Sequence, residues 1–132
     1  MRLHSRLISL LGLCGLLAQL APAQAALTSL TACQTITTSG SYVVRQNISA
    51  TGDCFVIQAD YVTISLAGYV ISGDGTGIGV TDEGNVRTGL TVRGGVLTNF
   101  DTGVDLAAST GSMLQNLRVL DNVSNGLLAV IH

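Results

Sequence analysis

From residue 26 onward the apolar residues come in short runs in which they alternate with polar residues, and helical periodicity is almost absent. Glycine, asparagine, aspartate and serine separate these runs, a pattern typical of strands joined by tight turns. The runs are SYVVRQNI (41–48), CFVIQA (54–59), YVTISL (61–66), YVI (69–71), GIGV (77–80), GLTV (89–92), GVL (95–97), GVDL (103–106), LRVL (117–120) and GLLA (126–129). The sequence therefore predicts an all-β fold of short strands.

These runs form an internal repeat. Sliding the chain along itself places Val70 on Val96, and a second, slightly shorter slide places Val96 on Val119. The period is therefore 26 residues in the first slide (96 − 70) and 23 in the second (119 − 96). A period of this length with three short strands is typical of one coil of a right-handed parallel β-helix. Such coils must stack, because one coil cannot bury its own apolar face. We expect about three to four coils. The predicted inward ladders are Val70/Val96/Val119, Ile71/Leu97/Leu120 and Ile78/Val104/Leu127, with Asn99 stacked over Asn122 at a turn.

The two clearest coils are CFVIQADYVTISLAGYVISGDGTGIGV (54–80) and GLTVRGGVLTNFDTGVDL (89–106). From Cys33 to about Ala129 the chain resembles the secreted right-handed parallel β-helix repeat proteins of the pectate-lyase-like superfamily. The resemblance implies an architecture and does not specify a reaction.

Residues 1–25 have the features of a secretory signal peptide. A basic start precedes an apolar stretch (7–20), and Ala23 and Ala25 form an A-x-A cleavage pattern. The apolar stretch is too short to favour a membrane span. We expect a secreted or periplasmic protein without a membrane segment after cleavage. Residues 26–60 would form an N-terminal cap and first coil, and residues 61–132 further coils. Because the chain stops inside a new coil, we expect it to be the N-terminal part of a longer β-helix.

Charge and cysteine content narrow the classes of protein. After cleavage four arginines and eight acidic residues remain, a net charge of 4 − 8 = −4, and the chain has no lysine. A basic face for nucleic acid is therefore not expected. Removal of Cys14 leaves Cys33 and Cys54, which are expected to form a disulfide in an oxidising compartment. A metal site at these cysteines is disfavoured, because only His132 could join them.

The tripeptide Asp101-Thr102-Gly103 matches the active-site motif of aspartic proteases. In the self-alignment, however, it falls on residues 75–77 (GTG) and on residues 124–126 (SNG). A position that accepts Gly, Asp or Ser is typical of a turn. The second segment that braces a protease loop is also missing, so we interpret this motif as a turn in which the glycine is needed.

Carboxylates and arginines are the remaining candidates for chemistry. The resemblance implies that polysaccharide lyases of this kind hold Ca²⁺ with carboxylates on adjacent coils and use an arginine or lysine as base. The candidate cation or glycan contacts are Asp74, Asp101, Asp105, Asp121, Arg93 and Arg118. The alternative, which we favour, is that they are solvated turn carboxylates and outward arginines. No complete catalytic set and no metal site are predicted, and Ca²⁺ is the one candidate ion.

We therefore expect an exported scaffold that binds a polysaccharide, a cell-surface glycan or another partner, alongside further coils of the same longer protein. The alternative is the N-terminal part of a polysaccharide lyase whose active site lies beyond residue 132. A third hypothesis, an accessory protein for copper-enzyme maturation, is disfavoured because the mature part lacks a set of methionine and histidine ligands.

Overall fold

The computed structural model describes residues 26–128, and within this range it contains strands and no helix. The strands are β1 (Leu27–Leu30), β2 (Gln34–Ile36), β3 (Gly40–Val44), β4 (Ile48–Ser49), β5 (Phe55–Ile57), β6 (Val62–Ser65), β7 (Val70–Ser72), β8 (Ile78–Thr81), β9 (Thr91–Thr98), β10 (Thr102–Asp105), β11 (Met113–Leu120) and β12 (Asn125–Leu128). The predicted all-β class is confirmed. Since the described residues include no helix, no helix in this range could cross a membrane.

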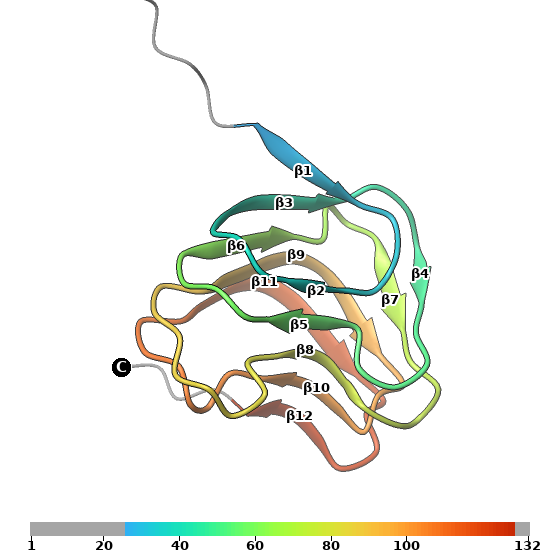
Figure 1. Cartoon of the computed structure of the whole chain (residues 1–132). Coiled ribbons are helices and arrows are strands. Elements are labelled where there is room, and N and C mark those ends of the chain that lie inside the picture. Colours follow the sequence, from blue (N-terminus) through green and yellow to red (C-terminus); the bar gives the residue numbers. More distant parts are fainter. Residues whose placement is uncertain (1–25, 129–132) are drawn as a thin grey trace, which may run out of the picture.

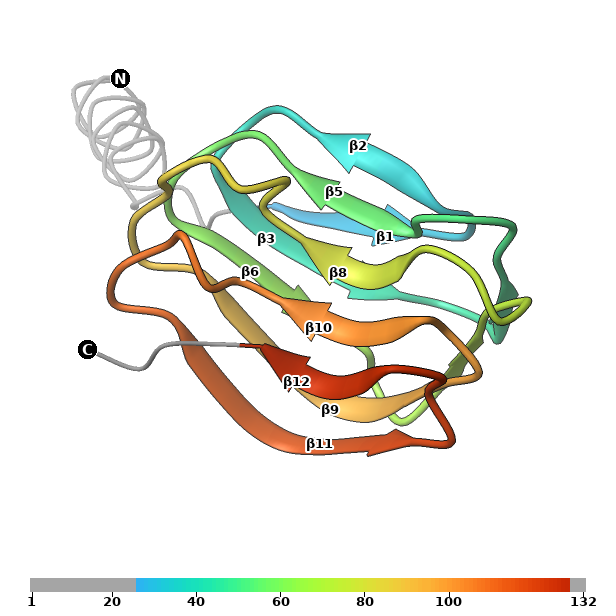
Figure 2. The ribbon, with the colours of Figure 1, turned by 90° about the horizontal axis from the view of Figure 1, so that it is seen from below.

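The strands stack as a parallel β-solenoid of about four turns (Figures 1 and 2). Every strand pairing is parallel, and the two sheets have the orders β1-β3-β6-β9-β7-β4, with β11 beside β9, and β12-β10-β8-β5-β2. The long strand β9 serves two sides of its coil, because Thr91–Arg93 pair with β6 and Val96–Thr98 pair with β7. The predicted parallel β-helical architecture is confirmed.

Each coil thus has three flanks, which position all the side chains discussed below. The first flank consists of β1, β3, β6 and the first halves of β9 and β11. The second flank consists of β4, β7 and the second halves of β9 and β11. The third flank consists of β2, β5, β8, β10 and β12. Strand β1 extends the first flank in register with β3, and β2 extends the third flank beside β5, so residues 27–36 form the first layer of the stack.

The core is a column of apolar side chains that point inward from the three flanks. The inward ladders are Tyr42/Ile64/Val92/Leu114 on the first flank, Ile48/Ile71/Leu97/Val119 on the second and Phe55/Val80/Val104/Leu127 on the third. Most members are fully buried, and Phe55 and Phe100 are the largest of the fully buried side chains in the core. Neighbouring coils lie roughly 4.8 Å apart. Each side chain in a ladder therefore contacts the equivalent side chains of the coils before and after it, and these contacts remove its apolar surface from water.

The predicted ladders are correct in part. Val70 does pair with Val96 and Ile71 with Leu97. Only the second pair is inward, however: Ile71 and Leu97 are fully buried, whereas Val70 and Val96 are half-buried and face outward. In the last coil the prediction is displaced by one position: Val119 lies on Leu97, and Arg118 lies on Val96. On the third flank Val104 lies on Val80 instead of Ile78. The reason is that the loops differ in length, so the number of residues between paired positions differs from flank to flank. It is 91 − 63 = 28 from Thr63 to Thr91 on the first flank, but 102 − 78 = 24 from Ile78 to Thr102 on the third.

The predicted asparagine stack is replaced by two different turn contacts. Asn99 adopts a left-handed backbone conformation (φ 58°), and its amide nitrogen Nδ2 donates to the carbonyl oxygen of Gly73 at 2.9 Å. At the same corner of the next coil Asp121 takes the left-handed conformation (φ 51°). Asn122 follows it and accepts a hydrogen bond from the Phe100 amide at 2.9 Å. Both side chains therefore tie one coil to its neighbour.

Candidate functional site

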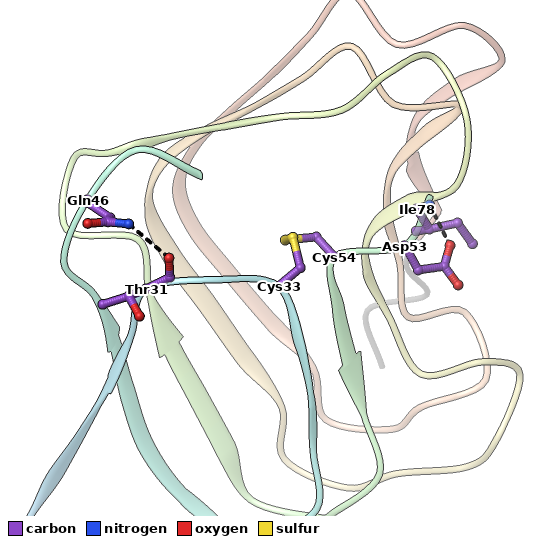
Figure 3. The surroundings of a disulfide bond; sticks show 6 residues. All are labelled: Thr31, Cys33, Gln46, Asp53, Cys54 and Ile78. Carbon is purple, nitrogen blue, oxygen red and sulfur yellow. Dashed lines mark hydrogen bonds between the residues drawn. A yellow bond between two sulfur atoms is a disulfide. The ribbon is translucent and has the colours of Figure 1, made fainter. Parts of the chain in front are cut away.

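The predicted disulfide is present between Cys33 and Cys54, whose Cα atoms are 4.4 Å apart (Figure 3). Cys33 lies in the loop between β1 and β2, and Cys54 lies immediately before β5 in the next coil. Cys54 is almost completely buried. The bond links two adjacent coils at the N-terminal end of the core. A disulfide of this kind is typical of proteins in an oxidising environment.

Three of the predicted carboxylates lie at one corner of the solenoid, in the loops that lead from the second flank to the third. We call this the acidic corner and define it by Asp53, Asp74, Asp101 and Asp121, one from each successive coil. Asp53 was not predicted. Its Oδ1 accepts the amide of Ile78 at 2.8 Å (Figure 3). The repeat could have revealed it, because each of the four residues lies in the same loop of its coil.

Two other carboxylates of the acidic corner, those of Asp74 and Asp101, also accept hydrogen bonds from the loops. Asp74 Oδ1 accepts the hydroxyl of Thr76 at 2.6 Å and its backbone amide at 3.0 Å. Asp101 Oδ1 accepts the hydroxyl of Ser124 in the next coil at 2.6 Å. The hydroxyl and amide of Thr76 lower the pKa of Asp74, because they stabilise its ionised form. Each of these contacts shapes a turn, which agrees with the interpretation as turn carboxylates.

Only Asp101 of the D-T-G segment lies in a turn, because Thr102 and Gly103 already belong to β10, and one half of the predicted alignment is wrong. Thr102 pairs with Asn125 on one side, as predicted, but with Ile78 instead of Thr76 on the other. Gly103 does not form the turn; it lies inside β10, with a backbone conformation open to any residue. A Cβ at this position would lie 2.2 Å from Val119 Cγ1. The glycine is therefore needed for close packing between the second and third flanks.

Asp105 lies away from the acidic corner, at the far end of β10 from Asp101. The strand between them separates the two aspartates by roughly 13 Å, so they do not converge on one ion. Asp105 Oδ1 accepts the amide of Ala107 at 3.2 Å. This contact makes Asp105 a turn residue at the corner where the third flank leads back to the first.

This second corner contains a buried carboxylate that the sequence did not reveal. Asp82 is 1% exposed; its Oδ1 accepts the Gly84 amide at 2.9 Å, and its Oδ2 accepts the hydroxyl of Ser109 at 2.7 Å. Ser109 is equally buried and belongs to the next coil. The pair therefore holds two successive loops together, and neither residue is open to solvent. It carries no chemistry that a substrate could reach.

The two candidate arginines lie on different flanks. Arg93 is exposed on the first flank, where it pairs with Ser65 on one side and Gln115 on the other. Arg118 lies on the second flank, where it pairs with Val96. The bend of β11 at Asn116 (φ 50°) separates the two flanks. Neither arginine lies in a ladder with a carboxylate.

No group of three or more metal-ligating side chains occurs within residues 26–128. A hollow of about 440 Å³ lies at the C-terminal end of the stack, lined by Leu114, Asn116, Leu117, Val119, Gly126 and Leu127. Its lining is mostly apolar and contains no charged side chain. Comparison of the chain with protein-family models, with curated proteins and with solved structures found no match.

Proposed function

We propose that this chain is an exported, non-catalytic β-solenoid scaffold that binds an extended glycan along its first flank. The observation that carries the proposal is the outward surface of that flank. Two columns of outward side chains run across the coils, Ser41/Thr63/Thr91/Met113 and Ser65/Arg93/Gln115. Hydroxyl, guanidinium and amide groups dominate these columns, and they are the groups that hydrogen-bond to sugar hydroxyls and carboxylates.

The geometry of this flank suits an extended chain. Its strands lie side by side in one parallel sheet, so equivalent side chains repeat at roughly 4.8 Å along the solenoid. Thr63 and Thr91 alternate with the buried residues Ile64 and Val92, and their side chains therefore stand out from the sheet. Arg93 supplies the positive charge that would favour uronic-acid units. A regular polar surface of this kind can contact successive sugars in the same way.

Export is supported by the leader-like residues 1–25 and by the disulfide. Residues 1–25 lie outside the described part of the chain, so the predicted signal peptide remains a prediction. The resemblance to secreted β-helix proteins of the pectate-lyase-like superfamily is in keeping with a glycan ligand. The lyase alternative is less well supported, because Arg93 has uncharged neighbours in its ladder and the carboxylates already hold turns.

The test is a binding measurement on the exported protein with polygalacturonate, alginate and a neutral β-glucan. Titration calorimetry of the wild type should show binding to at least one of them. We expect the double variant Thr63→Val/Thr91→Val to bind the glycan at least about fivefold more weakly, because it loses one or two hydrogen bonds to the sugar. Thr98→Val is the matched control, because Thr98 stands outward from the second flank of the same strand.

Two results would contradict glycan binding along the first flank. The first is an absence of binding to all three polymers. The second is equal weakening by the control variant, which would show that the first flank is not the binding surface. Formation of unsaturated uronate product by the wild type would instead support the lyase alternative, and it would contradict the non-catalytic assignment.

A further inference from the structure

An exposed tyrosine stands beside the polar columns of the first flank. Tyr61 is 66% exposed and lies directly before β6, in the connection from β5 on the third flank to β6 on the first (Figure 1). From this residue onward the fully buried Val62 and Ile64 alternate with the partly exposed Thr63 and Ser65. Tyr61 therefore faces outward on the same side as Thr63, and its ring adjoins the surface to which we assign the glycan.

The backbone of Tyr61 has a conformation that suits glycine better than tyrosine. Its φ is 52°, and the equivalent residues of the next two coils, Gly89 and Gly111, have φ values of 68° and 65°. Glycine adopts this left-handed conformation freely, whereas a bulky side chain makes it unfavourable. Tyr61 is the one aromatic residue of the described range with such a backbone. Unfavourable conformations cluster at ligand-binding sites, so the tyrosine points to a role beyond the turn.

The ring of Tyr61 is held over the next coil. A Cβ at Gly89 would lie 2.7 Å from Tyr61 Cδ1 and 3.0 Å from Cε1, so the ring occupies the space that a side chain at position 89 would fill. The Tyr61 amide donates to the carbonyl oxygen of Thr88 at 2.8 Å, and the Tyr61 carbonyl oxygen accepts the Gly40 amide at 3.1 Å. Asp60 Oδ1 accepts the Thr88 amide at 3.0 Å. The ring is thus supported before a ligand arrives, which lowers the entropic cost of binding.

We propose that Tyr61 is an aromatic subsite of the glycan surface, on which one pyranose ring of the glycan stacks. This inference rests on the proposed function and adds to it the kind of contact that the polar columns lack. A pyranose ring carries C–H groups on its faces and hydroxyls at its edge. The face of an aromatic ring is partially negative and apolar, so it attracts the C–H groups and shields them from water.

The spacing along the strands indicates the class of ligand. Thr63 follows Tyr61 by two residues, and Thr91 follows Gly89 by two, so both hydroxyls lie roughly 7 Å along the strands from the stacked ring. Arg93 lies two residues further, roughly 13 Å from Gly89. One pyranose ring is too short to contact both Tyr61 and Arg93. The surface therefore suits an oligosaccharide or polymer in which the stacked pyranose and a carboxylate-bearing unit are different members of one chain.

The test repeats the titration calorimetry with polygalacturonate, alginate and the neutral β-glucan on the exported protein. Tyr61→Asn removes the ring, and because asparagine tolerates the left-handed backbone, the variant should keep or exceed the wild-type stability in urea. It should bind the glycan at least about tenfold more weakly. Tyr61→Phe keeps the ring and should bind within about twofold of the wild type. Tyr69→Asn is the matched control, because Tyr69 is also exposed but lies directly before β7 of the second flank.

A second pair of variants displaces the ring without altering it. Gly89→Ala places a methyl group where the Tyr61 ring lies, whereas Gly111→Ala adds the same group 3.8 Å from its nearest heavy atom. Both glycines have left-handed φ values, so both substitutions strain the backbone to a similar extent. We expect Gly89→Ala to weaken binding several-fold and Gly111→Ala to leave it unchanged. In NMR spectra the ring protons of Tyr61 should shift when glycan is added, in contrast to those of the buried Tyr42.

Several outcomes would overturn the aromatic subsite. The first is equal binding by the wild type and Tyr61→Asn, and the second is equal weakening by Gly89→Ala and Gly111→Ala. A loss in Tyr61→Phe as large as that in Tyr61→Asn would assign the contact to the hydroxyl instead of the ring face. If Thr63→Val/Thr91→Val weakens binding while Tyr61→Asn does not, the subsite fails and the glycan surface stands. Absence of wild-type binding to all three polymers overturns both, so the two failures are distinguishable.

Discussion

The disulfide gives the prediction whose magnitude the structure defines best. Cys33 and Cys54 are separated by 21 positions in the sequence, which sets the size of the closed loop. In the chain-entropy model, a cross-link of this span destabilises the unfolded state by about 3.3 kcal/mol near room temperature. Cys54 is also buried, so Cys33→Ala/Cys54→Ala should lose packing in addition. We expect the free energy of unfolding to fall by about 3–4 kcal/mol in total.

The assay is urea unfolding of the exported protein and of the double variant, followed by circular dichroism. The m-value should rise in the variant, because its unfolded chain exposes more surface without the cross-link. Reduced wild-type protein is the matched control, since it loses the cross-link without a change in sequence. A loss below about 1 kcal/mol in both samples would refute the reasoning. It would mean that the first layer is held by strand pairing and packing alone.

Two further predictions concern single side chains. Gly103→Ala should destabilise the fold by about 1–3 kcal/mol in urea unfolding, because its Cβ would clash with Val119. Gly126→Ala is the control and should change the free energy of unfolding little, since the added Cβ would lie 3.8 Å from its nearest heavy atom. Equal destabilisation by the two variants would contradict the packing argument. Thr76→Val should raise the pKa of Asp74, measured by carboxyl NMR, because it removes the hydroxyl donor. Because the pKa of Asp74 is lower in the folded protein than in the unfolded chain, its ionised carboxylate stabilises the fold at pH values above the unfolded-state pKa. This stabilisation is lost as the pH falls through the folded-state pKa. An unchanged pKa of Asp74 in Thr76→Val would contradict the role given to the hydroxyl.

The fold was largely predictable because its signals are local and repeated. Short alternating runs define the strands, and the self-alignment brings Val70 and Val96 together as the structure does. The exact ladders were less predictable, because one constant shift cannot describe loops of unequal length. The loop between β8 and β9 covers residues 82–90 and displaces the first flank relative to the third. An error of one position then exchanges an inward residue for an outward one, as at Val119 and Leu120.

The candidate site was less predictable than the fold. The sequence places Asp74, Asp101 and Asp121 in equivalent turns, but it does not show that loop amides and hydroxyls already occupy the carboxylates of Asp74 and Asp101. Asp82 lies in a segment (T-D-E-G) that looks like an ordinary exposed turn. Its burial depends on Ser109 from the following coil. Contacts between coils decide such cases, and they are known only once the register is known.

The last described coil contributes side chains to the proposed glycan surface. In a solenoid each coil is stabilised by its neighbours, so an interior coil has two contacts and a terminal coil has one. Among the described strands β11 pairs with β9 alone, yet it supplies Met113 and Gln115 to the first flank. A glycan that contacts these two residues together with Thr91 and Arg93 would favour the pairing of β11 with β9 by the same factor by which that pairing favours the glycan.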